Sequence, residues 1–434
     1  MNKKISLGAT ITLMILAAAI TFSVTMIYYM DVFNGKVYNL KERETMYSQL
    51  SELDRIVRTN YVDAIDEDAL NEALADGYME GTGDRYGRFF TAEEYESYMI
   101  DLEGRVVGIG VSATQDPSGY ILINEVYSES PAEIVGLQAG DLIVKVDELD
   151  VNAENYTQAV EAIRGEEGSK VNITYRRESE DTTIEVTRRK VDIPTVFSRM
   201  ISGNVGYVQV TEFNDSTAHQ FSTKVDELMN QGAASLIFDM RNNGGGTLNA
   251  VTTMLDKLLP EGEIVSATYK DGTTKVLAKS NEDEINLPMV VLINRNTASA
   301  AELFTQALRD YGKAQSVGET TYGKGTMQTV KKLNDGSAVN ITVAYYLPPS
   351  GISYDEVGIQ PDYEVELTPE MEENLANLDE TTDLQLKKAM EVVVAAMREA
   401  GIELGQDVPE VDLESQPAED ASSEEESSSS ESEE

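Results

Sequence analysis

The chain has 434 residues and a formal net charge of −43, with 77 acidic against 34 basic side chains. This balance excludes a nucleic-acid-binding protein, which needs a basic face to contact phosphates. The chain has no cysteine and one histidine, His219, which excludes thiolate chemistry, disulfides and multi-histidine zinc sites, so we expect no metal and no other cofactor.

The first 30 residues are predicted to be a membrane anchor. Residues 5–30 carry no charge, and Lys3 and Lys4 precede them. A bilayer needs about 20 apolar residues, more than the roughly 7–15 of a cleavable signal core. The alternative is a cleaved signal, for which Ala17-Ala18-Ala19 offers small residues. Because the lysines stay inside, we expect a single-pass cell-membrane protein with the rest of the chain outside the cytoplasm.

Residues 31–100 are predicted to be a helical segment. An apolar stripe at helical spacing is formed by Tyr47, Leu50, Leu53, Ile56 and Val57. Such a stripe packs either on the body of the protein or against a second copy of the chain. A homodimer is therefore one expected outcome.

Residues 101–190 are predicted to form a separate, mainly β domain. The run of Val107, Gly108, Ile109, Gly110 and Val111 is either a β-bulge or a loop whose N–H groups receive a carboxylate. A helix is predicted downstream from the spacing of Tyr156, Ala159, Val160 and Ile163.

With Ser130-Pro131-Ala132 and Gly140-Asp141-Leu142 between them, these stretches resemble a PDZ domain. The resemblance implies that residues 107–111 bind the terminal carboxylate of a peptide. It also implies that Tyr156 and Val160 wall the groove.

From residue 191 to residue 370, strand and helix patterns alternate, which predicts an α/β domain with a parallel sheet. One strand, Leu236–Met240, runs into the glycine-rich turn Asn242–Gly246. Glycines there free backbone N–H groups to bind an anion. A phosphate-binding loop is the rival interpretation, but the Lys-Ser/Thr pair that closes such a loop is absent.

A second strand, Met289–Ile293, leads to Ser299, where a helix is predicted to begin. At such a turn the hydroxyl is exposed, and unpaired N–H groups and the helix dipole favour negative charge. That is a suitable place for a nucleophile and an oxyanion. The alternative is a serine N-cap without chemistry, since serine is a favoured cap.

A nucleophilic Ser299 needs a base. His219 lies in a polar segment and is interpreted as a surface residue, which leaves a lysine as the natural base. Lys324 follows 25 positions after Ser299, between two glycines. It must be desolvated to accept a proton at neutral pH. Gln328 lies on the same face of an extended chain as Lys324 and is placed to orient its amine.

Three motifs in this order, Asp239–Gly246, Thr297–Glu302 and Tyr322–Gly325, resemble those of the carboxy-terminal processing proteases, the tail-specific S41 serine peptidases. The resemblance implies a crotonase/ClpP-like core with an inserted PDZ domain. Its implied catalytic residues are Ser299 as nucleophile, Lys324 as general base and Gln328 as orienting partner. The implied oxyanion hole is formed by the N–H groups of Ala300 and Gly245. The chain departs from the family at Gly244, where proline or serine is usual.

The chain is predicted to close with a helical segment at residues 371–403 and a tail at residues 404–434. The helix is indicated by Leu384, Ala389, Val392, Val393 and Ala396. After Leu404 the sequence is dominated by Asp, Glu, Ser and Pro, which predicts disorder.

The whole sequence is interpreted as a membrane-anchored, extracytoplasmic serine endopeptidase that captures accessible protein C-termini in its PDZ groove and cleaves them. Two alternatives remain: an anchored PDZ adaptor on an inactive protease body, and an acyl-transfer enzyme on the same scaffold. Peptide products from a denatured protein distinguish the first interpretation from the adaptor.

Overall fold

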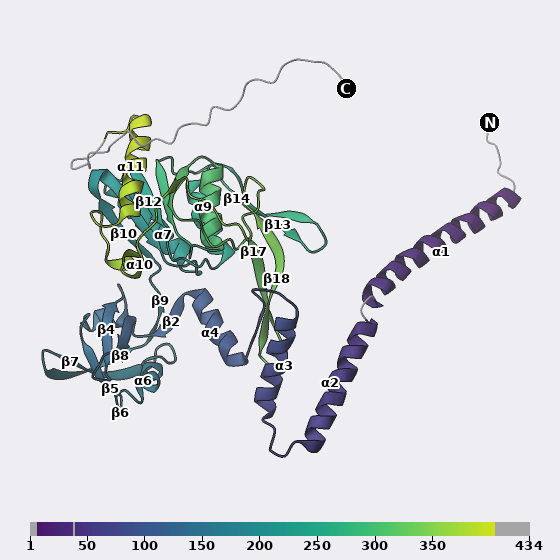
Figure 1. Cartoon of the computed structure of the whole chain (residues 1–434), viewed down its shortest axis with the longest axis horizontal. Coiled ribbons are helices and arrows are strands. Elements are labelled where there is room, and N and C mark those ends of the chain that lie inside the picture. Colours follow the sequence, from purple (N-terminus) through teal and green to yellow (C-terminus); the bar gives the residue numbers. More distant parts are fainter. Residues whose placement is uncertain (1–6, 38–39, 404–434) are drawn as a thin grey trace, which may run out of the picture. The chain divides into compact units, whose positions relative to one another are not determined.

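The computed structural model describes residues 7–37 and 40–403, and the chain divides into two compact units after Tyr78 (Figure 1). The predicted disorder of the acidic tail, residues 404–434, lies outside the described residues, as do the first six residues of the predicted anchor.

The first unit is helical. It contains α1 (Leu7–Val37), α2 (Leu40–Asn60) and most of α3 (Glu67–Gly81). The predicted apolar stripe lies on α2 and is exposed, from 38% at Val57 to 61% at Tyr47. Within residues 7–37 and 40–403, no helix combines the length and the apolar character needed to cross a membrane.

The second unit begins with a short strand that the helical prediction did not include, β1 (Arg88–Phe90), followed by α4 (Ala92–Glu103). Thr91 caps α4 by accepting a hydrogen bond from Glu94 N. A two-stranded pair, β2 (Arg105–Gly108) with β9 (Arg189–Asp192), then brackets the mainly β region.

That mainly β region is a six-stranded antiparallel sheet with two helices. The strands are β3 (Val111–Gln115), β4 (Ile121–Val126), β5 (Leu142–Val146), β6 (Leu149–Asp150), β7 (Lys170–Arg177) and β8 (Glu180–Thr187). The helices are α5 (Pro131–Ile134) and α6 (Tyr156–Ile163). A separate apolar core includes Ile109, Ile121, Ile143 and Ala159, so the inserted region has an interior of its own.

The α/β body is built on a second six-stranded sheet, in the order β10-β11-β12-β15-β16-β19. Its strands are β10 (Val196–Ile201), β11 (Val205–Val210), β12 (Ser235–Asp239), β15 (Met289–Ile293), β16 (Ala314–Gly318) and β19 (Tyr363–Glu364). All pairs except β10–β11 are parallel, which confirms the predicted α/β architecture.

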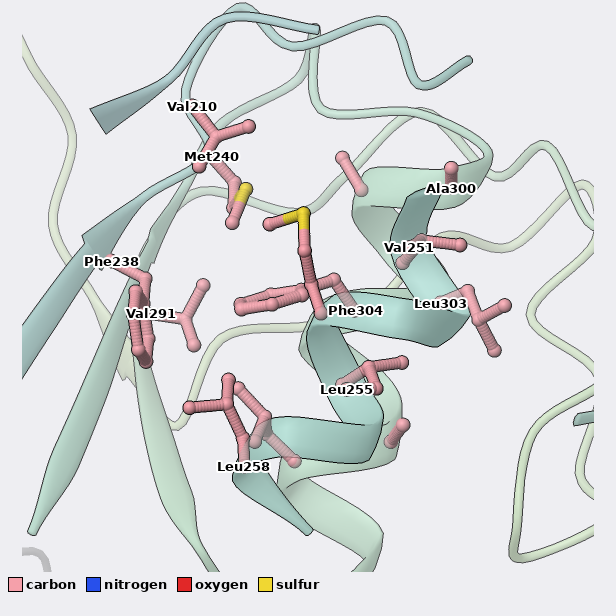
Figure 2. Packing of buried hydrophobic residues seen from close by; sticks show 14 of the residues in the cluster. Val210, Phe238, Met240, Val251, Leu255, Leu258, Val291, Ala300, Leu303 and Phe304 are labelled. Atoms are coloured by element: carbon pink, nitrogen blue, oxygen red, sulfur yellow. The ribbon is translucent and has the colours of Figure 1, made fainter. Parts of the chain in front are cut away.

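Both faces of this sheet are buried, which explains why β15 is apolar at every position. Val291 points into the core formed with α7 (Thr217–Asn230), α8 (Leu248–Leu258) and α9 (Ala300–Asp310). Its neighbours Val290 and Leu292 point into the opposite core, under α11 (Leu384–Glu399). Figure 2 shows Phe304 of α9 packed toward Phe238 of β12, with ring centroids 5.3 Å apart.

A third sheet, β1-β18-β13-β14 with β17 on β18, carries the predicted hairpin. Its remaining strands are β13 (Gly262–Tyr269), β14 (Thr274–Ser280), β17 (Thr326–Lys332) and β18 (Ala338–Leu347). Asp84 Oδ2 accepts a hydrogen bond from Thr342 N of β18 at 2.7 Å, so the turn before β1 is fixed on this sheet. The short elements are η1 (Ser202–Asn204), α10 (Pro369–Glu373) and η2 (Leu375–Asn377).

Candidate active site

Ser299 lies at the turn between β15 and α9, as the N-cap residue of α9, which confirms the predicted start of the helix. Its φ of 56° is in the left-handed region, which is uncommon for a residue with a side chain. Backbone strain of this kind clusters at functional sites. Ser299 is partly exposed.

Glu302, one turn into α9, connects the Ser299 turn to the Lys324 loop. Its side chain is fully buried, and its Oε2 accepts hydrogen bonds from Ser299 N and Lys324 N, both at 2.8 Å. The two backbone nitrogens are therefore no farther apart than the sum of these distances. Oε1 accepts from Gly323 N at 2.7 Å and from Thr321 Oγ1 at 2.6 Å. Burial raises the pKa of Glu302, although its four donors act in the opposite direction.

Lys324 lies in the loop before β17 and is partly buried. Burial lowers the pKa of Lys324, and the Glu302 carboxylate opposes this shift. Its Nζ lies over the ring of Tyr86, 4.6 Å from the centroid. Among the described residues, no hydrogen bond joins Lys324 Nζ to Ser299 Oγ, so the amine rests on an aromatic face in this conformation.

Gln328 lies on β17, and within the described part of the chain its side chain has no hydrogen bond to Lys324. Its Nε2 donates to Thr326 Oγ1 at 2.9 Å and to Thr342 Oγ1 at 3.2 Å. The register of β17 on β18 shifts between Met327 and Gln328. This irregularity breaks the strict alternation of side chains on which the same-face prediction depended.

The two predicted oxyanion donors differ in their bonding. Ala300 N, the first N–H of α9, has no acceptor among the described residues and is free to bind an oxyanion. Gly245 N instead donates to Asn243 Oδ1 at 2.8 Å. A Cβ added at Gly245 would lie 2.8 Å from Ser299 Cβ, so the turn is in close contact with Ser299.

The predicted peptide-binding residues line a cavity of about 210 Å³ between β3 and α6. Four residues of the loop, Gly108 to Val111, form one side, and Tyr156 and Val160 form the other. Val107, which lies on β2 and not in the cavity lining, is the exception. Ile109 is only 1% exposed, so it forms the floor of the cavity.

Sequence reasoning did not assign roles to Glu302 and Tyr86. A glutamate in the first turn of a helix has the ordinary interpretation of complementing the helix dipole. Tyr86 is far from Lys324 in sequence, and the two lie together because residues 84–90 bind β18, through the bonds of Asp84 and the pairing of β1. His219 is exposed, as predicted.

Three features together indicate a serine peptidase with a peptide-binding module: a serine at a strained strand-to-helix turn, a partly buried lysine beside it, and an inserted β domain with a cavity. A model of peptidase family S41 matches residues 204–365, and a PDZ domain model matches residues 122–177.

Comparison with individual proteins shows which kind of serine peptidase this chain resembles. The chain is 32% identical over 358 residues to the carboxy-terminal processing protease CtpA of Bacillus subtilis, covering 81% of this chain and 75% of that protein. It is 29% identical over 360 residues to a probable CtpA-like serine protease of Staphylococcus aureus, covering 82% and 72%. The solved structure of a photosystem II D1 C-terminal processing protease is 30% identical, with a TM-score of 0.44 and coverage of 73% and 86%. The chain belongs to the carboxy-terminal processing proteases of peptidase family S41.

Proposed function

We propose that this protein is an endopeptidase that recognises the C-terminal tails of proteins through its PDZ domain. On a crotonase/ClpP-like core, it cleaves them with a dyad of Ser299 and Lys324. The observation that carries the proposal is the shared carboxylate of Glu302, which bonds the backbones of both residues. A nucleophile and a base 25 positions apart in sequence are thereby held next to each other.

The chemistry follows from these positions. Neutral Lys324 Nζ takes the proton of Ser299 Oγ, which attacks the scissile carbonyl and forms a tetrahedral intermediate. Ala300 N–H donates to the developing oxyanion. The lysine ammonium then gives its proton to the leaving amine, an acyl-enzyme remains on Ser299, and water hydrolyses it. For the first step the amine has to turn from the Tyr86 ring to the serine.

Gly245 and Gln328 have conditional roles in this mechanism. The Gly245 N–H becomes a second oxyanion donor only when it leaves Asn243 Oδ1. Gln328 orients the lysine only when its amide turns from Thr326 and Thr342. Removing one oxyanion donor typically costs about 10²–10³-fold in turnover, so both donors are worth testing separately.

Substrate recognition is proposed to take place in the PDZ cavity. The backbone N–H groups of residues 108–110 would receive the terminal carboxylate, and the apolar side chain of Ile109 in the cavity lining would contact the last side chain. Affinity would then depend on a free α-carboxylate with an apolar terminal residue.

The test is cleavage of two matched peptides that differ only in a free or an amidated C-terminus. Full-length protein in detergent should cut the free form with the lower KM, and mass spectrometry should identify the products. Ser299→Ala and Lys324→Ala should each abolish cleavage, whereas His219→Gln should be silent. Equal cleavage of both peptides would reject C-terminal recognition, and an active Lys324→Ala would reject the dyad.

We also propose that the protein is held at the cell membrane by residues 1–30, with its body outside the cytoplasm, and that it forms a homodimer. The uncharged residues 5–30 and the exposed stripe on α2 support these two proposals. The anchor is tested by alkaline extraction of membranes and by protease accessibility in intact cells. The homodimer is tested by the mass of the detergent-solubilised protein. Release of the full-length chain by alkali would reject the anchor.

A further inference from the structure

Three charged side chains are packed together in the interior of the protease body. Asp239 ends β12, Arg241 follows two residues later, and Asp383 is the N-cap of α11. Their side chains are 1%, 3% and 3% exposed. Arg241 Nη2 lies 2.5 Å from Asp239 Oδ2, and Nη1 lies 2.8 Å from Asp383 Oδ2. The dyad mechanism assigns no step to any of them.

Further hydrogen bonds complete this buried ion cluster, as we call Asp239, Arg241 and Asp383. Gln385 Oε1 accepts from Arg241 Nη1 at 3.0 Å, and the Tyr207 hydroxyl donates to Asp239 Oδ2 at 2.6 Å. Burying three charged side chains costs free energy, because each loses its contact with water. Apolar residues of similar size in their place often give a fold of equal or greater stability. A role in fixing local geometry is therefore the better explanation of the cluster.

The cluster is directly connected to the turn beside Ser299. Arg241 N donates to Asp239 Oδ1 at 3.0 Å, so the first peptide of the turn is bound to the same carboxylate as the guanidinium. Two residues later, Asn243 O accepts from Ala298 N at 2.9 Å. Asn243 Oδ1 holds Gly245 N at 2.8 Å. A continuous set of contacts thus runs from α11 to the nucleophile turn.

We propose that Asp383 is a positioning residue for the cleavage reaction: from the N-terminus of α11 it holds Arg241, and through Arg241 it holds the Asn243–Gly245 turn against Ser299. This inference rests on the proposed dyad mechanism. It makes the C-terminal helix, which lies on the opposite face of the sheet from α9, a part of the catalytic apparatus.

Asp383 also has a structural role, because its carboxylate accepts a hydrogen bond from Leu386 N at 3.0 Å and caps α11. Two substitutions separate the roles. Asp383→Ser keeps a favoured cap but is too short to reach Arg241. Asp383→Asn keeps the size and the cap, but its single side-chain oxygen is used by Leu386 N, so an NH₂ group replaces the oxygen that faces Arg241. Thr368→Ala is the matched control, because it removes the cap of α10 at an exposed residue without a bond to Arg241.

Full-length variants are compared by kcat, KM and thermal unfolding. Displacement of the Asn243–Gly245 turn would weaken stabilisation of the transition state and not binding of the substrate. Asp383→Ser should therefore lower kcat about tenfold or more, with KM little changed. Asp383→Asn, which also lacks the contact, should lower kcat to a similar extent, and Thr368→Ala should keep wild-type kcat. Combining Asp383→Ser with Arg241→Lys should cost less than the product of the single effects, because both act through one contact.

Equal kcat for Asp383→Ser and wild type would overturn the inference, as would a loss in kcat that Thr368→Ala reproduces. An Asp383→Ser chain that does not fold, with an Asp383→Asn chain that folds and keeps wild-type kcat, would assign Asp383 to folding alone and overturn it too. If the proposed dyad mechanism itself were wrong, Ser299→Ala would remain active. This result is distinguishable from a failure of the inference on Asp383.

Discussion

Lys324 has to lose its proton before it can act as a base, and its surroundings act on that proton in opposite directions. Burial lowers the pKa of Lys324, while the Glu302 carboxylate favours the charged form. The Tyr86 ring, 4.6 Å from Nζ, also favours the ammonium through its negative π face. Since only the neutral amine can take the Ser299 proton, activity is expected to rise with pH through the pKa of Lys324.

Replacing Tyr86 should move this rise. Tyr86→Leu removes the ring and its attraction for the ammonium, so the pKa of Lys324 falls and the rising limb of kcat/KM moves to lower pH. A cation–π contact of about 0.5–1 kcal/mol corresponds to roughly half a pH unit. Tyr86→Phe keeps the ring and should leave the limb in place. A limb that is unchanged in the leucine variant would show that the contact has no effect on the base.

Glu302 offers a second test at the level of one side chain. Glu302→Gln keeps the shape but turns an NH₂ group toward N–H donors, which leaves buried donors unpaired. Each unpaired donor costs about 1–3 kcal/mol, so both the free energy of unfolding and kcat/KM should fall. Chemical denaturation and peptide cleavage measure the two effects. Glu372→Gln, which changes a carboxylate paired with the exposed Arg295, is the control. A glutamine variant with wild-type activity would contradict the role of Glu302.

At the scale of elements, the glycine turn after β12 and the nucleophile turn after β15 are packed so closely that one glycine is indispensable. Gly245 has a φ of 99°, and a Cβ there would lie 2.8 Å from Ala298 O. Its neighbour Gly244 has no atom within 4 Å of an added Cβ, so the position tolerates a side chain. The Gly244 position therefore has room for the proline or serine that the sequence resemblance leads us to expect, as well as for glycine.

Alanine at these two neighbouring positions should therefore have opposite outcomes. Gly245→Ala forces the two turns apart and should lower kcat by about 10²-fold or more, since misplacement by about 1 Å has effects of that size. Gly244→Ala should leave kcat within about twofold and the unfolding midpoint almost unchanged, as is usual for surface substitutions. Similar losses in both variants would mean that flexibility of the turn, and not the contact at Gly245, is what matters.

Short sequence patterns correctly predicted the helix and the strands around the candidate site. The features that they missed depend on contacts between segments that are distant in sequence. The helix that starts after Ser299 and the β17–β18 hairpin follow from residues next to each other in sequence. The bond from Gly245 N to Asn243 and the irregularity before Gln328 depend on how strands meet, which residue spacing does not encode. Glu302 accepts hydrogen bonds from both Ser299 N and Lys324 N, contacts that its position in the first turn of the helix gave no reason to suspect.

At the scale of the whole molecule, two distinct sites are expected to act on one substrate. Under the proposed function, the PDZ cavity determines how tightly a tail is held, and the dyad of Ser299 and Lys324 determines how fast it is cut. A change in the cavity should therefore appear mainly in KM, provided that binding and chemistry are separable.

Val160 allows this separation to be tested. It lines the cavity from α6, so Val160→Glu places a negative charge beside the expected terminal carboxylate and should raise KM for a free-ended peptide at least tenfold. Gln158→Glu adds the same charge to the same helix at an exposed residue that does not line the cavity. It should be close to wild type, and cleavage of an amidated peptide should be equal in both variants. A KM unaffected by Val160→Glu would exclude the cavity as the recognition site.

The dyad is tested most directly by locating the acyl group on the enzyme. Full-length protein mixed with a peptide ester and quenched in acid should gain the mass of the acyl fragment, and peptide mapping should place it on Ser299. Lys324→Ala should show no such adduct on the same time scale at neutral pH, because the serine keeps its proton. An acyl group on another residue, or acylation of Lys324→Ala at the wild-type rate, would contradict the Ser299–Lys324 mechanism.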